Sequence, residues 1–138
     1  MSIIVNITQN MLPAILRDSP AKLDRGIEAL AEMGRGQAVI LLNTQTSGTR
    51  EIRRTPTRTV TVSQAGDAPN TDTGFLAASI TVQPAGHLAR VIAVGAEYGE
   101  WLEFGTENMA ARPFMTPMAD WLSGQAEAVM TAIGRTLA

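Results

Sequence analysis

The sequence contains no cysteine and is poor in several other residues on which catalysis depends. Without cysteine there can be no disulfide framework, no thiolate metal site and no cysteine nucleophile. One histidine and one tyrosine leave little material for acid–base chemistry. The 138 residues carry 11 basic and 13 acidic side chains, and this net charge of −2 argues against a general nucleic-acid binder. These shortages favour a structural or interaction protein over an enzyme, and they call for no cofactor.

Long hydrophobic runs are also missing. The longest unbroken apolar stretch, residues 38–42, is far shorter than the ~20 residues that a membrane span needs. No positive segment precedes the apolar residues at the N-terminus, so we expect no export signal. With 45% hydrophobic residues, the chain has the composition of one folded domain, residues 1–138. We therefore expect a soluble protein that is made inside the cell.

Two amphipathic helices are expected, one in each half of the chain. Ser19 can cap a helix that Pro20 opens, and apolar residues then recur at steps of three and four until about Thr46. Near the C-terminus, Thr116 and Pro117 form the same kind of start signal, and a second apolar stripe follows almost to the last residue.

Strands and short helices account for most of the remaining chain. Alternation and β-branched content predict strands at residues 3–7, 57–62, 80–83 and 88–94. The last two are joined by Pro-Ala-Gly-His and should form an antiparallel hairpin. Short helices are expected at residues 10–17, 74–79 and 98–104, the second capped by Thr73 and the third ended by Gly105 in a left-handed conformation. The fold class is thus α+β, with the two long helices packed on a small antiparallel sheet.

A polar, threonine-rich segment at about residues 47–71 is predicted to be a flexible arm, in which residues 57–62 form an edge strand or stay extended. It carries four arginines within nine residues: Arg50, Arg53, Arg54 and Arg58. They could contact an anionic partner, either nucleic acid or an acidic protein surface, or could simply be solvated. No aromatic residue lies among them to stack on bases, which weighs against nucleic acid.

Four glutamates, Glu97, Glu100, Glu103 and Glu107, are spaced so that they could share a helical face. Such a face could hold a cation or perform acid–base chemistry, but carboxylates at this spacing more often form a solvated surface. The single histidine, His87, lies in a predicted turn without evident partners. The solvated interpretation is favoured for all of them.

The most distinctive segment is residues 98–117, which hold four of the six aromatic residues of the chain. Aromatic side chains near an arginine are typical of two structures: a hydrophobic core, here one that covers the predicted hairpin, or an assembly interface. The residues alone do not distinguish between the two. We expect Phe104 and Phe114 to be buried.

Three segments resemble one known family. Residues 98–106 (YGEWLEFGT) are similar to its aromatic box, and residues 111–114 (ARPF) are similar to the box that follows. Upstream, GDAP at residues 66–69 and DTGFL at residues 72–76, followed by Ser79-Ile80, resemble its first segment. The family is that of the small head–tail joining or tail-completion proteins of long-tailed bacteriophages and prophages, the gene-product-ten-like group.

This resemblance implies a structural virion protein at the head–tail neck, assembled in the host cytoplasm, with no enzymatic activity, cofactor or metal. It implies a homo-oligomeric ring, which we expect to contain six copies. The ring would surround the DNA channel without sequence-specific DNA binding, would contact neighbouring neck and tail proteins, and would not bind a membrane. A tail-terminator ring that caps the tail tube is the alternative role, and a small DNA-binding protein using the arginine cluster is the alternative class.

Glu103 and Arg112 could form an ion pair. The residues expected to maintain the assembly-competent shape are Tyr98, Trp101, Glu103, Phe104, Gly105, Thr106, Arg112, Pro113 and Phe114, with a turn and cap at Asp72, Thr73, Gly74 and Leu76.

Overall fold

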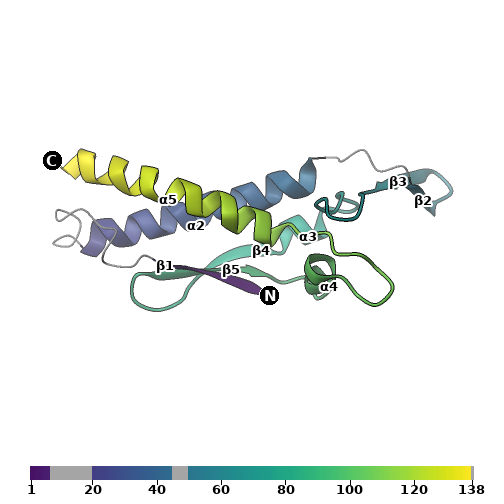
Figure 1. Ribbon diagram of the computed structural model, residues 1–138, viewed down its shortest axis with the longest axis horizontal. Helices are drawn as coiled ribbons and strands as arrows, with labels where there is room; N and C mark the ends of the chain where they lie inside the picture. Colours follow the sequence, from purple (N-terminus) through teal and green to yellow (C-terminus); the bar gives the residue numbers. More distant parts are fainter. Residues whose placement is uncertain (7–19, 45–49, 138) are drawn as a thin grey trace.

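The computed structural model describes residues 1–6, 20–44 and 50–137. Two long helices, α2 (Pro20–Asn43) and α5 (Met115–Leu137), run antiparallel along one face of a three-stranded sheet (Figure 1). The sheet consists of β1 (Ser2–Asn6), β4 (Ile80–Pro84) and β5 (Ala89–Val94). The expected α+β class, with both helices on a small antiparallel sheet, is confirmed. The expected helical turn at residues 10–17 and the cap Ser19 lie outside the described residues.

The sheet has the strand order β1-β5-β4, and both pairings are antiparallel. The predicted hairpin is present, with Ile80 opposite Val94 at its open end. Apolar residues of β5 and β1 face the helices, and Ile92 is fully buried against them. Arg90 crosses from the sheet to α2, where it binds Asp24 at 2.8 Å and also Glu28. The hydrogen bond from Arg90 holds the pKa of Asp24 below its ordinary value.

Helix α2 begins at Pro20 as predicted but ends at Asn43, three residues before the expected end at Thr46. The last carbonyl groups of a helix have no partner within it. Here the Thr71 hydroxyl donates to the carbonyl oxygen of Leu42 at 2.6 Å. The helix end is therefore tied to the loop that leads to α3 (Phe75–Ala78).

A glycine on the apolar stripe of α2 lets α5 and the sheet approach closely. A Cβ atom on Gly34 would lie 2.7 Å from Ile92 Cδ1 and 2.9 Å from Leu122 Cδ2, whereas one on Gly36 would meet nothing within 4 Å. Gly36→Ala should therefore stabilise the protein by about 1 kcal/mol, the usual helix-propensity gain. In Gly34→Ala, crowding of the new Cβ atom against Ile92 and Leu122 should cancel that gain, so the variant should be no more stable than wild type. Urea denaturation of the pair checks this, and an equal gain at both positions would contradict the close packing.

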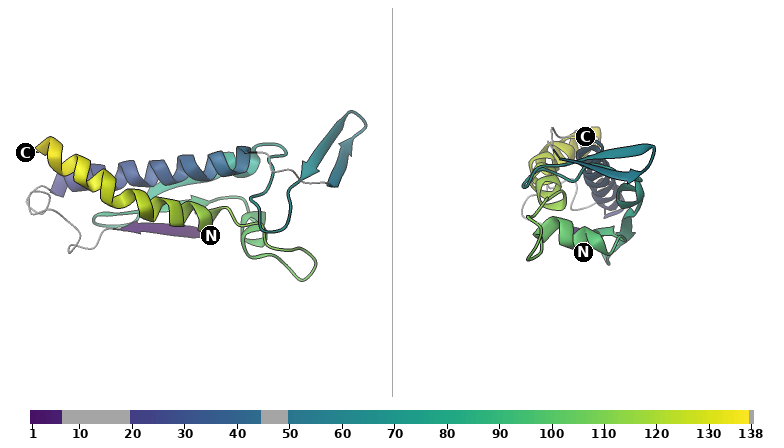
Figure 2. Two further views of the ribbon diagram at one scale, coloured as in Figure 1. Left: turned by 45° about the horizontal axis from the view of Figure 1, so that its top comes forward. Right: turned by 90° about the vertical axis from the view of Figure 1, so that its right-hand side faces the viewer.

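The basic arm is paired with itself. Strands β2 (Arg50–Thr55) and β3 (Arg58–Val62) form a separate two-stranded antiparallel sheet, joined by Pro56-Thr57. The expectation of one edge strand or extended segment was therefore incomplete, because residues 50–55 supply a second strand. This hairpin extends from the end of the molecule opposite the C-terminus (Figures 1 and 2). The flexibility expected of residues 47–71 stays a prediction, and residues 47–49 lie outside the described part.

Candidate assembly site

The three family-like segments meet at the end of the molecule where α4 (Tyr98–Phe104) follows β5 (Figure 1). Helix α4 has the predicted bounds. Gly99 lies so close to β5 and α3 that a Cβ atom there would be 2.8 Å from Val94 Cγ1 and 3.6 Å from Leu76 Cδ1. The backbone N–H of Arg112 donates to the carbonyl oxygen of Leu102 at 2.6 Å, joining the second box to the first.

Glu103 is the buried centre of this region, with only 4% of its surface exposed. One carboxylate oxygen accepts hydrogen bonds from the backbone N–H groups of Phe114 (2.8 Å) and Met115 (2.9 Å). The other accepts from the backbone N–H of Thr116 (2.8 Å) and from its hydroxyl (2.6 Å). Pro117, next in the chain, has no N–H to satisfy. Glu103 thus satisfies the free donors at the start of α5, where a negative charge also suits the helix dipole.

These contacts correct two sequence-based expectations. Helix α5 begins at Met115, so Thr116 and Pro117 lie inside its first turn instead of capping and opening it. Glu103 does not pair with Arg112, because both of its oxygens are directed to the helix start. Arg112 instead donates from a terminal nitrogen to the hydroxyl of Ser63 at 3.2 Å, while its Nε is buried without a partner.

The ionisation of Glu103 reflects this environment. Burial raises its pKa, but the hydrogen bonds from the Thr116 hydroxyl and from the three backbone N–H groups outweigh burial. The pKa of Glu103 therefore lies below its ordinary value, and the carboxylate is charged at neutral pH.

Gly105 turns the chain out of α4 with φ 76° and ψ 177°. The positive φ was expected, but the extended ψ differs from the left-handed helical conformation that we predicted. A Cβ atom here would lie 2.8 Å from the Met109 carbonyl oxygen, so both space and φ require glycine. Thr106 then pairs with Met109 in an isolated antiparallel bridge that closes the loop.

The aromatic residues divide between core and surface. Phe114 is fully buried, as expected, and partly buried Pro113 leads into it. Phe104 is 68% exposed, so the prediction of its burial was wrong. It lies at the last position of a short helix whose inner face is taken by Gly99 and Glu103. Trp101 is also exposed, at 58%.

Helix α3 presents a further aromatic residue that the sequence did not single out. Phe75 is 59% exposed, and its ring lies 6.3 Å from that of Tyr98. The Thr73 hydroxyl accepts a hydrogen bond from the Phe75 N–H at 3.3 Å, although the residue at the cap position is Gly74, with φ 80°. Among the described residues, four of the six large exposed hydrophobic side chains belong to α3 and α4.

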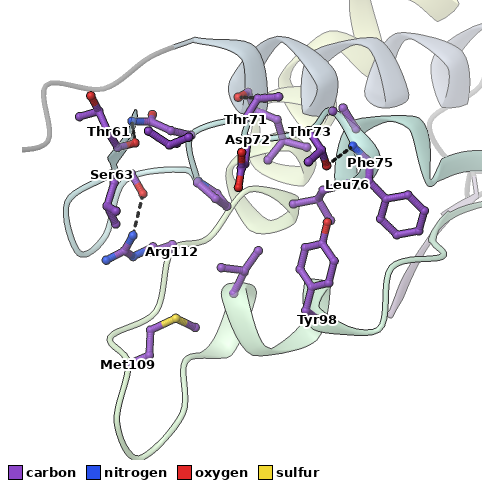
Figure 3. A pocket seen from close by; sticks show the side chains of 18 residues that line it. Thr61, Ser63, Thr71, Asp72, Thr73, Phe75, Leu76, Tyr98, Met109 and Arg112 are labelled. Carbon is purple, nitrogen blue, oxygen red and sulfur yellow. Dashed lines mark hydrogen bonds between the residues drawn. The ribbon is translucent and has the colours of Figure 1, made fainter. Parts of the chain in front are cut away.

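A cavity of about 530 Å³ separates these helices from the base of the hairpin (Figure 3). Its wall is mostly apolar and includes Leu76 and Leu102, with Asp72 and Arg112 among its polar members. Figure 3 shows Tyr98 beside Leu76 and Phe75, with Arg112 near Ser63 on the opposite side. Residues from the predicted turn and cap (Asp72, Thr73, Gly74 and Leu76) and from the predicted assembly motif (Tyr98 and Arg112) therefore line one space.

The remaining candidates lie apart from this site or on its surface. Glu97, Glu100 and Glu107 are exposed, and His87 is exposed in the turn between β4 and β5. In residues 1–6, 20–44 and 50–137, no three His, Cys, Asp or Glu side chains come together as metal ligands would. Arg50, Arg53, Arg54 and Arg58 all belong to the hairpin strands.

Two roles were missed from the sequence: the capping of α5 by Glu103 and the contact of Ser63 with Arg112. Both join residues far apart in the chain, and no local pattern signals such pairs.

None of the helices in the described part of the chain is long and apolar enough to span a membrane. Comparison with family models, curated proteins and solved structures finds no match to this chain.

Proposed function

We propose that this chain is a structural protein of the bacteriophage neck that forms a ring at the head–tail junction. The proposal rests on the resemblance of residues 66–80, 98–106 and 111–114 to the head–tail joining family. One observation supports it most: these segments, separate in sequence, pack into one region from which large aromatic side chains project into solvent. An exposed aromatic cluster of this kind is typical of a protein interface.

The internal construction of the site also supports an assembly role over catalysis. Its buried carboxylate, Glu103, is fully occupied by the start of α5 and has no free oxygen for a substrate. The groups that face solvent include Phe75, Trp101, Phe104 and the neighbouring acids, which suit contact with a protein surface.

The function is tested in the phage or prophage that encodes the chain. We expect the double variant Trp101→Ala/Phe104→Ala to keep the wild-type melting temperature, since both side chains are mostly exposed. Infectious particles should fall at least about tenfold, because truncating interface aromatics removes much of the binding energy. Electron microscopy should then show filled heads separate from complete tails.

Ile40→Ala is the matched control, because Ile40 is 58% exposed but lies on α2 outside the three segments. It should join heads to tails normally. In wild-type virions, immunogold labelling should place the chain at the neck. Label on the tail tip or on no virion part would overturn the proposal, and unjoined heads with uncapped, overlong tails would favour the tail-terminator role.

A further inference from the structure

Helix α4 carries an acidic and aromatic stripe that nothing in the described part of the monomer covers. Glu97, Glu100, Trp101 and Phe104 follow one another at steps of three, one and three, so they lie on one face of the helix. All four are exposed. The opposite face is the one that packs, through Gly99 and Glu103, against the body.

The β2–β3 hairpin has the complementary charge. Its strands hold four arginines against one acidic residue, Glu51. Its two strands pair with each other, and at its base Val60 and Val62 line the cavity. A two-stranded hairpin alone is only marginally stable in water, so it gains stability from packing on another surface.

We propose that the hairpin of one copy binds the α4 stripe of the next copy. This inference rests on the proposed ring and names its subunit contact. The two surfaces are different parts of one chain, so their pairing is head-to-tail and can close into a ring. Arginine matches the stripe chemically, because it pairs with carboxylates and stacks on the face of Trp101.

A second copy suits the hairpin better than DNA. No aromatic residue stands in either strand to stack on bases, and the acidic α4 lies at the same end of the molecule as the hairpin. Phosphate backbones would be repelled by that helix, whereas a neighbouring subunit presents the acids as partners.

Charge reversal in the full-length chain tests this contact. One variant carries Arg53→Glu/Arg54→Glu in the hairpin, and the other carries Glu97→Lys/Glu100→Lys at the start of α4, where Glu97 is the N-cap residue. In sedimentation velocity, each variant alone should self-associate at least about tenfold more weakly than wild type, because like charges then face each other. An equimolar mixture should recover association, since each altered surface finds its opposite on the other variant.

The control Asp120→Lys/Glu127→Lys changes two exposed acids of α5 by the same charge and should associate as wild type does. Circular dichroism of every variant verifies the fold. If neither charge reversal weakens self-association, or if the mixture does not recover it, the proposed contact is wrong. The proposed neck ring would not be contradicted by either result. Failure of the wild-type chain to associate at any concentration, together with no neck label on virions, would overturn both. Salt-sensitive duplex binding lost on hairpin reversal, without any effect on self-association, would assign the hairpin to DNA instead.

Discussion

Replacing Glu103 with alanine should lower the free energy of unfolding by about 3 kcal/mol, because buried donors at the start of α5 lose their acceptor. Phe114 and Met115 are buried, so water cannot fully replace the carboxylate there. Glu103→Gln should cost about half as much, since its amide oxygen still accepts but the charge is gone. Urea denaturation at pH 7 measures both.

The effect of Glu103 should also depend on pH. Its pKa is lower in the folded protein than in the unfolded chain, so the ionised carboxylate adds stability above the ordinary glutamate value of about 4.3. This contribution is lost as the pH falls through the depressed folded value. Wild type and Glu103→Gln should therefore differ at pH 7 and converge in acid.

Glu100→Gln is the control for both experiments. It lies on the same helix but is exposed, and its removal should change stability by less than about 0.5 kcal/mol at either pH. A Glu103 variant as stable as wild type at pH 7 would contradict the capping of α5.

Phe114→Ala should destabilise the protein by about 3–5 kcal/mol, because the ring is fully buried and its loss leaves a cavity in the core. Phe104→Ala removes the same atoms from an exposed position and should cost less than about 0.5 kcal/mol. The two melting temperatures, measured together, separate the core aromatic from the surface one. Equal losses would mean that Phe104 is buried against the body.

Local signals in the sequence were enough to predict most of the elements. Pro20 opens α2, and α4 ends at Gly105, as their residue types require. The turn between β4 and β5 covers residues 85–88, one residue later than the predicted Pro-Ala-Gly-His, because Pro84 still pairs with Arg90. In each case the information lies within a few neighbouring residues, through the fixed φ of proline or the freedom of glycine. The α+β class followed, because two amphipathic helices need an apolar partner and the short strands provide it.

The pairing of β2 with β3 depended on the tertiary structure. Residues 50–55 (REIRRT) hold three arginines and only one apolar residue, so they have little strand character of their own. They become a strand because the Pro56-Thr57 turn brings them back along Arg58–Val62, whose backbone groups they satisfy.

The structural roles of Glu103, Phe104 and Phe114 in the candidate site were likewise decided by packing. By itself, the spacing of Glu103 matches a solvated acidic face, yet its carboxylate caps a helix that begins twelve residues later. Phe104 and Phe114 look alike in sequence, yet one faces solvent and the other the core. Helical spacing defines which residues share a face, but which face is buried depends on the elements packed against it, and these come from distant parts of the chain.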